Sequence, residues 1–200
     1  MNLHSEDRGI SLAMIGTEDL CRRVAAFIAA QHSDVKLHPG NYAEAWSVFS
    51  ACRPEAVLIE IGWHYNAKIH TAMRSFLERL RDRSGEEIFI IAALTSPAHL
   101  SFGGDLLFAA GNDLTPSRLL NAFVAVAPSH MPSLPSLPAQ VLDVLICLRH
   151  DLERRRTGKP PLPPLGTPGW AQSMADPQSR ALWMRWLPRY ASYTLSLIHI

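Results

Sequence analysis

The chain lacks long hydrophobic runs and a signal sequence. None of its 200 residues belongs to a stretch of about 18 consecutive apolar residues, the length that a transmembrane helix needs. The first ten residues, MNLHSEDRGI, are polar and lack the apolar core of a secretory signal peptide. These absences predict a protein that makes no contact with a membrane.

Clustered cysteines and an excess of charge are also missing. The three cysteines, Cys21, Cys52 and Cys147, lie far apart and form no CxxC pair, which predicts free thiols in a reducing compartment, the cytoplasm. Lys and Arg together number 19 against 18 Asp and Glu, so the formal net charge is +1. A nearly neutral chain has no global field that would attract nucleic acid.

Proline is abundant and divides the chain. Most of the 15 prolines fall in two clusters that have neither helical nor strand periodicity, and such segments are typical of extended, semi-rigid linkers. They predict a domain over residues 9–126, a Pro/Ser linker over 127–138, a helix over 139–156, a Pro-rich linker over 157–169 and a further segment over 170–194.

Within residues 9–126, short apolar runs alternate with amphipathic segments. Strands are predicted over 10–16, 34–38, 56–62 and 87–96, and helices over 18–32, 42–53, 67–83, 97–111 and 117–127. This alternation predicts a parallel sheet with helices on both faces. The fold class is therefore α/β, a flavodoxin-like, doubly wound parallel sheet, with little room for a fifth strand near 112–116.

In that fold, the loops after the first, third and fourth strands meet in one crevice. Here they carry Gly16 and Thr17, then Glu60, then Thr95 and Ser96. Glu60 closes the apolar run of PEAVLIEIGWH, so a lone carboxylate is expected in the crevice.

PEAVLIEIGWH resembles the strand of response-regulator receiver domains that ends in the phospho-accepting aspartate, and LLFAAGNDLTP is similar to the segment leading into their last strand. The resemblance implies that Glu60 occupies the acceptor position and that Gly16 and Thr17 replace the paired acids that hold magnesium. It places the hydroxyl of either Thr95 or Ser96 beside the acceptor. The family's lysine before a proline is missing from residues 114–116.

A receiver with these replacements implies no aspartyl-phosphate chemistry, because phosphoryl transfer needs cations to neutralise developing charge. We expect no catalytic residue, no cofactor and no metal, since no Cys or carboxylate joins the histidines at ligand spacing. Two interpretations of Glu60 remain. It stands in permanently for a charged acceptor, or it is a strand-end acid satisfied by nearby backbone N–H groups.

The segment over 139–156 has an apolar stripe formed by Val141, either Val144 or Leu145, Leu148 and Leu152. A helix of this length is marginal alone in water, so the stripe must find a partner. It either dimerises with a second chain, which would make the protein a homodimer, or packs back onto the first domain.

Residues 170–194 contain an aromatic stripe interleaved with arginines, in ADPQSRALWMRWLPRY. This segment is similar to the entry helix of the ATPase domain in sigma-54-dependent transcriptional activators, which implies a chain truncated before the ATPase core. An aromatic stripe of this kind is typical of a core face whose partner is missing, and an RNA-stacking surface is the alternative. Residues 195–200, LSLIHI, depart from the preceding composition and are expected to be a scar.

Together these features predict a non-catalytic pseudo-receiver that controls a transcriptional activator through protein–protein contacts, independently of phosphorylation. Its expected partners are a second copy, the downstream ATPase domain and a regulatory protein, with DNA bound only through domains beyond this sequence. Two alternatives belong to other classes. One is a small-ligand sensor or enzyme using the same crevice, and the other is a purely structural oligomerisation module.

Overall fold

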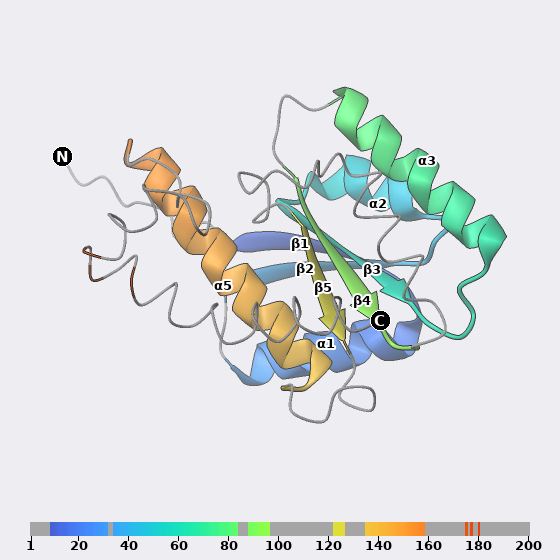
Figure 1. Cartoon of the computed structure of the whole chain (residues 1–200), viewed down its shortest axis with the longest axis horizontal. Helices are drawn as coiled ribbons and strands as arrows, with labels where there is room; N and C mark the ends of the chain where they lie inside the picture. The colour runs from blue at the N-terminus through green and yellow to red at the C-terminus, as the bar shows by residue number, and fades with distance from the viewer. Residues whose placement is uncertain are drawn as a thin grey trace.

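The computed structural model describes residues 9–31, 34–83, 88–96, 122–126 and 135–158, together with the single positions Ala175, Pro177 and Arg180. Its centre is a parallel five-stranded sheet in the order β2-β1-β3-β4-β5 (Figure 1). This strand order is that of flavodoxin-like doubly wound domains. The predicted fold class is confirmed.

The strands and helices alternate along the chain, as predicted for most of the domain. They are β1 (Ile10–Ile15), α1 (Glu18–Ala30), β2 (Val35–Gly40), α2 (Ala45–Cys52), β3 (Ala56–Ile61), α3 (Ala67–Arg83), β4 (Phe89–Leu94), β5 (Ala122–Val126) and α5 (Leu137–Arg156).

Two apolar cores lie on opposite faces of the sheet. Side chains of α1 and α5 pack against alternate residues of the strands, such as Leu12 and Leu58, on one face. Those of α2 and α3 pack against the intervening residues, such as Ala13 and Ile59, on the other. Every residue of β3 and β4 is buried, because a central strand covered on both faces needs no polar side.

The edge strand β2 differs from these central strands. Its residues are only partly buried or exposed, and it contains Pro39. Proline cannot donate to a strand ladder and is therefore confined to sheet edges. Since β2 pairs with β1 alone, the position of Pro39 agrees with the observed topology.

One secondary-structure prediction is wrong. Residues 117–127 were expected to form a helix, but Ala122–Val126 form β5, which pairs in parallel with β4. A five-residue apolar run cannot be assigned to strand or helix by periodicity alone. The free edge of β4 gives this run backbone partners, and so favours the strand.

The helix over 139–156 belongs to the α/β domain. It starts at Leu137, and its apolar stripe joins the core beneath α1, where Val141 and Leu145 are 0% and 1% exposed. Leu148 packs against the same core, and Leu152 is partly buried. Arg149 also lies 3.7 Å from the Asp34 carboxylate, which ties α5 to the start of β2.

The dimerising interpretation of Val141 and Leu145 is therefore wrong, and the alternative, packing back onto the first domain, is what the structure shows. An uncovered sheet face needs a helical layer, and α5 supplies part of it (Figure 1). The domain consequently extends beyond residue 126. The predicted helix over 97–111, most of both linkers, nearly all of residues 170–194 and the scar at 195–200 lie outside the described residues.

Candidate functional site

The carboxyl end of the sheet brings together residues from β1, β3 and β4. Glu60 lies in β3, next to Ala93 of β4 in the ladder. Side chains alternate along a strand, so Glu60 follows Leu58 onto the face covered by α1. Although it is charged, it is only 4% exposed.

The Glu60 carboxylate is held by three donors. Oε2 accepts the backbone N–H of Thr17 at 2.7 Å and the Thr17 hydroxyl, also at 2.7 Å. Oε1 accepts the Thr95 hydroxyl at 3.2 Å. A buried charge is costly unless hydrogen bonds compensate it, and these three donors supply that compensation.

Thr17 also caps helix α1. Its hydroxyl oxygen accepts the N–H of Leu20 at 3.3 Å while its hydrogen goes to Glu60. The acids Glu18 and Asp19 occupy the first helical turn. The positive end of the α1 dipole also faces the Glu60 carboxylate, which accepts the Thr17 N–H. This arrangement stabilises both the helix and the buried carboxylate.

Two glycines make the close approach possible. A Cβ on Gly16 would lie 2.7 Å from Glu60 Cβ and 2.8 Å from Oε2. On Gly62, a Cβ would lie 2.5 Å from Thr95 Oγ1 and 3.3 Å from Glu60 Oε1. Glu60 thus fills the space that a side chain at residue 16 would need, and Thr95, with Glu60 behind it, fills the space at residue 62.

Further contacts beside Glu60 come from His64, on the loop after β3, and from Tyr42, which was not predicted to lie in the crevice. The Tyr42 hydroxyl donates to the main-chain oxygen of Glu60 at 2.8 Å and lies 2.8 Å from Nε2 of His64. A hydroxyl has a single hydrogen, so His64 must carry a proton on Nε2 to complete both contacts. That nitrogen is also 3.9 Å from Oε2 of Glu60.

The buried carboxylate affects neighbouring groups that titrate. Burial, and then the charge of Glu60, raise the pKa of Tyr42 above its usual value. The same two causes raise the pKa of the Cys21 thiol on α1. Both groups are therefore neutral near pH 7, and Cys21 lacks the thiolate character of a reactive cysteine.

Of the two hydroxyls that the resemblance placed beside Glu60, Thr95 makes the contact. Ser96 is fully buried at 0% exposure, and no residue in the described part of the chain hydrogen-bonds to its hydroxyl. Neighbouring residues of an extended segment point in opposite directions, so only one of the pair can face Glu60.

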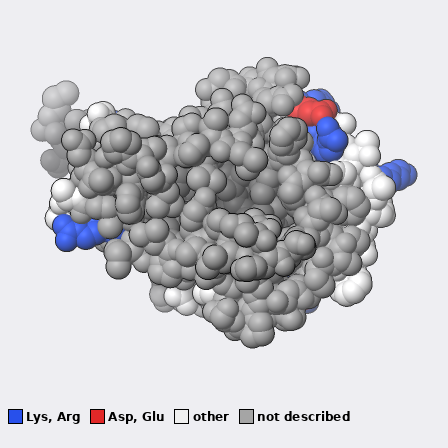
Figure 2. All heavy atoms as spheres, viewed as in Figure 1, with Lys and Arg blue, Asp and Glu red and all other residues white. Residues whose placement is uncertain are grey.

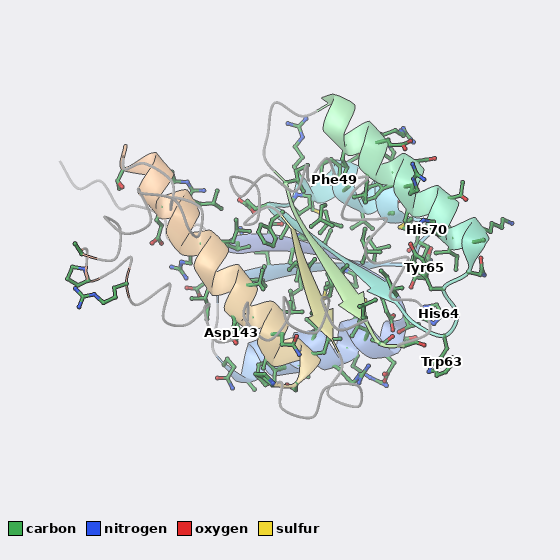
Figure 3. All side chains as sticks on the ribbon, in the orientation of Figure 1. Phe49, Trp63, His64, Tyr65, His70 and Asp143 are labelled. Carbon is green, nitrogen blue, oxygen red and sulfur yellow. The ribbon has the colours of Figure 1, made fainter. Side chains whose placement is uncertain are left out.

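The predicted crevice residues Gly16, Thr17, Glu60 and Thr95 are thus in contact. Figure 3 shows His64 and Tyr65 on the loop after β3, close to the carboxyl end of the sheet. Tyr42 was not predicted because the sequence marks it only by its position two residues after the end of β2. Nothing in the sequence pairs it with a residue 18 positions later.

Within the described ranges, no three His, Cys, Asp or Glu side chains gather where they could hold a metal ion. Of the two residues that the resemblance aligned with the magnesium-holding acids of receivers, Gly16 has no side chain and the hydroxyl hydrogen of Thr17 is directed to Glu60. Across the described helices, none is both long and apolar enough to cross a membrane.

No protein-family model matches this chain, and no curated protein matches it. The resemblance to receiver domains and to sigma-54-dependent activators consequently stays a prediction from the residues quoted above. The geometry of the crevice is the remaining guide to function.

Proposed function

We propose that this chain is a non-catalytic regulatory domain, a pseudo-receiver that acts through protein–protein contacts and without phosphorylation. The observation that supports this proposal is the state of Glu60, whose carboxylate is buried and bonded to Thr17 and Thr95. Open α/β sheets bind their ligands in this crevice, and here a side chain of the domain itself takes up the available donors.

The contacts around Glu60 do not suit phosphoryl transfer. A transferring phosphoryl group needs cations to neutralise its charge, whereas the groups that bind Glu60 are one amide and two hydroxyls. The amide at the start of α1 would favour an anionic ligand, but the carboxylate already occupies it. Glu60 therefore acts as a permanent, tethered anion that fixes one conformation of the crevice.

The identity of the partner that this domain would regulate is inferred from sequence resemblance alone. Residues 170–194 are similar to the entry of a sigma-54-dependent ATPase domain, so we propose that the domain holds or releases such an ATPase in a transcriptional activator. A cytoplasmic location, inferred from the cysteines and the polar N-terminus, and self-association, inferred from the apolar stripe over 139–156, remain predictions. In α5, Val141 and Leu145 are too buried to provide the self-association contact.

The first test is phosphorylation. The full chain is incubated with acetyl phosphate and Mg²⁺, and its intact mass is measured beside that of Glu60→Asp, which restores the acceptor of a receiver. We expect neither protein to gain a phosphoryl group, because no group of acids in the described part of the chain is placed to hold the metal. A modified wild-type chain would contradict the proposal.

The second test concerns the conformation that Glu60 fixes. Amide hydrogen exchange is compared for wild type and Glu60→Gln over Gly16–Leu20, the loop after β1 and the first turn of α1, where the Thr17 amide donates to Glu60. We expect faster exchange in the variant, since the amide cannot accept all three hydrogen bonds as the carboxylate does. Unchanged exchange would show that Glu60 does not determine the loop.

The rival function, a small-ligand sensor or enzyme, is distinguished by thermal denaturation with flavin mononucleotide or ATP. A ligand that binds only the folded state raises Tm. We expect no rise for either compound. A rise that is lost in Thr95→Val would place the ligand in the crevice and favour the rival.

A further inference from the structure

Tyr42 and His64 join two loops at the carboxyl end of the sheet. Tyr42 lies on the turn between β2 and α2, and His64 lies on the loop between β3 and α3 (Figure 3). The Tyr42 hydroxyl and Nε2 of His64 are 2.8 Å apart. The proposed function assigns no role to this contact.

Each of the two loops also has contacts of its own. In the turn after β2, the Asn41 side chain accepts two backbone N–H groups, at 2.9 and 3.1 Å. In the loop after β3, the Tyr65 N–H donates to the Gly62 oxygen at 2.9 Å. The buried ring of Tyr65 packs edge-on against that of Tyr42, with 5.7 Å between the ring centroids. Tyr42 therefore reaches the second loop with both its ring and its hydroxyl.

The Tyr42 hydroxyl has one hydrogen and two neighbouring atoms that could accept it. These are the main-chain oxygen of Glu60 and Nε2 of His64, each 2.8 Å away. While His64 carries hydrogen on Nε2, it donates to Tyr42, and Tyr42 donates to Glu60. If a neutral ring carries its hydrogen on Nδ1 instead, Nε2 accepts the phenolic hydrogen and the Glu60 oxygen loses this donor.

A charged His64 ring permits only the first of these two patterns. Both of its nitrogens carry hydrogen, so Tyr42 must donate to Glu60. The positive charge would also lie 3.9 Å from Oε2 of Glu60, and opposite charges at such a distance attract. Protonation of His64 therefore favours the pattern in which both contacts hold the two loops together.

The groups that contact this pair differ from histidine in how they titrate. Burial, and then the charge of Glu60, raise the pKa of Tyr42, and burial raises the pKa of Tyr65. The Cys21 thiol on α1 is kept neutral by the same two causes as Tyr42. Histidine is the side chain whose charge ordinarily changes between about pH 5 and 8. Of the described carboxylates, only that of Glu60 lies within 4.0 Å of a His64 ring nitrogen.

The remaining charged groups at this edge of the sheet are exposed residues at the starts of α1, α2 and α3: Glu18, Asp19, Glu44 and Lys68. Within the described residues, none of them forms an ion pair or hydrogen bond with His64. The face drawn in Figure 2 shows described charges only in small separate groups. A second histidine, His70 of α3, is 9% exposed and packs edge-on against Tyr65, so a test must separate it from His64.

We propose that Tyr42 and His64 form a pH-sensitive latch between the β2–α2 turn and the β3–α3 loop. A charged His64 closes the latch. A neutral His64 allows the Tyr42 hydrogen to leave Glu60, which loosens the β3–α3 loop. The latch depends only on these contacts, and it would make the carboxyl end of the sheet respond to pH whether or not the domain is regulatory.

The test is amide hydrogen exchange of the full chain, measured by NMR at the Tyr65 N–H and corrected for the intrinsic effect of pH. The two conditions are about pH 5.5 and about pH 8, on either side of the usual titration of histidine. We expect protection in wild type to be about threefold greater at the lower pH, an effect of the size that a partly exposed ion pair gives. His64→Gln should remove the difference, whereas the control His38→Gln on β2 should keep it.

Two further measurements separate a latch from simple packing. Tyr42→Phe keeps the ring beside Tyr65 but lacks the hydroxyl, so it should lower the protection and reduce its dependence on pH. Nitrogen NMR shifts of the His64 ring report where its hydrogen lies. We expect hydrogen on both nitrogens at the lower pH, and a population with hydrogen on Nδ1 at the higher pH.

Equal protection of the Tyr65 N–H in wild type at both pH values would overturn the proposal. A difference that persists in His64→Gln would also overturn it, and would assign the effect to another group such as His70. The same holds if neutral His64 carries its hydrogen on Nε2 alone, because Tyr42 would then always donate to Glu60. These outcomes are independent of the phosphorylation test, so the latch and the regulatory function can fail separately.

Discussion

The two ends of strand β3 carry the same side chain in different environments. Glu55 immediately precedes the strand and Glu60 lies near its end. Each carboxylate accepts a backbone N–H from the region of β1, Glu55 from Ser11 at 2.8 Å and Glu60 from Thr17 at 2.7 Å. Glu55 is only partly buried, whereas Glu60 is buried and has two additional hydroxyl donors.

The difference follows from the direction of a parallel sheet. Helix N-termini, with their free N–H groups, gather at the carboxyl end together with the loops that follow the strands. Glu60 therefore finds a helix cap, Thr17, and a loop hydroxyl, Thr95, while Glu55 at the amino end finds a strand amide. Identical residues thus become a surface contact at one end and the centre of a crevice at the other.

The largest expected effect on stability comes from replacing Glu60 with glutamine, and the same replacement at Glu55 is its control. Glu60→Gln should lower the free energy of unfolding by about 2–3 kcal/mol, because it removes a charged acceptor and leaves buried donors without it. Glu55→Gln, the matched control, should cost less than about 1 kcal/mol, since its single bond is partly exposed to water. Urea denaturation measures both.

If Glu60→Gln were as stable as wild type, burial of the carboxylate would cost as much free energy as its hydrogen bonds contribute. Glu60 would then be retained for function at the expense of stability, and the two ends of β3 would be energetically alike.

An intermediate effect is expected at Thr17, which serves both the helix and the carboxylate. Thr17→Ala removes the N-cap of α1 and one donor to Glu60, and should cost about 1–2 kcal/mol. Thr17→Ser keeps the hydroxyl and should remain close to wild type in the same denaturation experiment. Equal losses for both variants would mean that the threonine methyl, and not the hydroxyl, determines stability.

The smallest effect is expected at the third donor. Thr95→Val preserves the shape of the side chain but removes the 3.2 Å contact with Glu60, at a cost of about 0.5–1.5 kcal/mol. The adjacent Ser96→Ala removes a hydroxyl that has no hydrogen-bond partner in the described residues, so thermal denaturation should show no loss. A greater loss for Ser96→Ala would contradict the assignment of the two hydroxyls.

Much of the fold was predictable because strands and helices in residues 9–96 have clear and different periodicities. The sequence also predicted which loops meet, because the strand order of this fold class determines which strand ends are neighbours. The errors began where a local pattern was ambiguous. AFVAV fits a strand or a helix, and the apolar stripe with Val141 and Leu145 shows only that some partner is needed.

The sequence by itself determined the alternation of elements, the parallel sheet and the presence of one acid, Glu60, among apolar residues at its carboxyl end. Only the tertiary structure decided that α5 covers the sheet, that Thr95 and not Ser96 contacts the acid, and that Tyr42 and His64 enclose it. The physical reason is that periodicity reports how much of a segment is buried. Which groups bury it depends on contacts between residues that are distant in the chain.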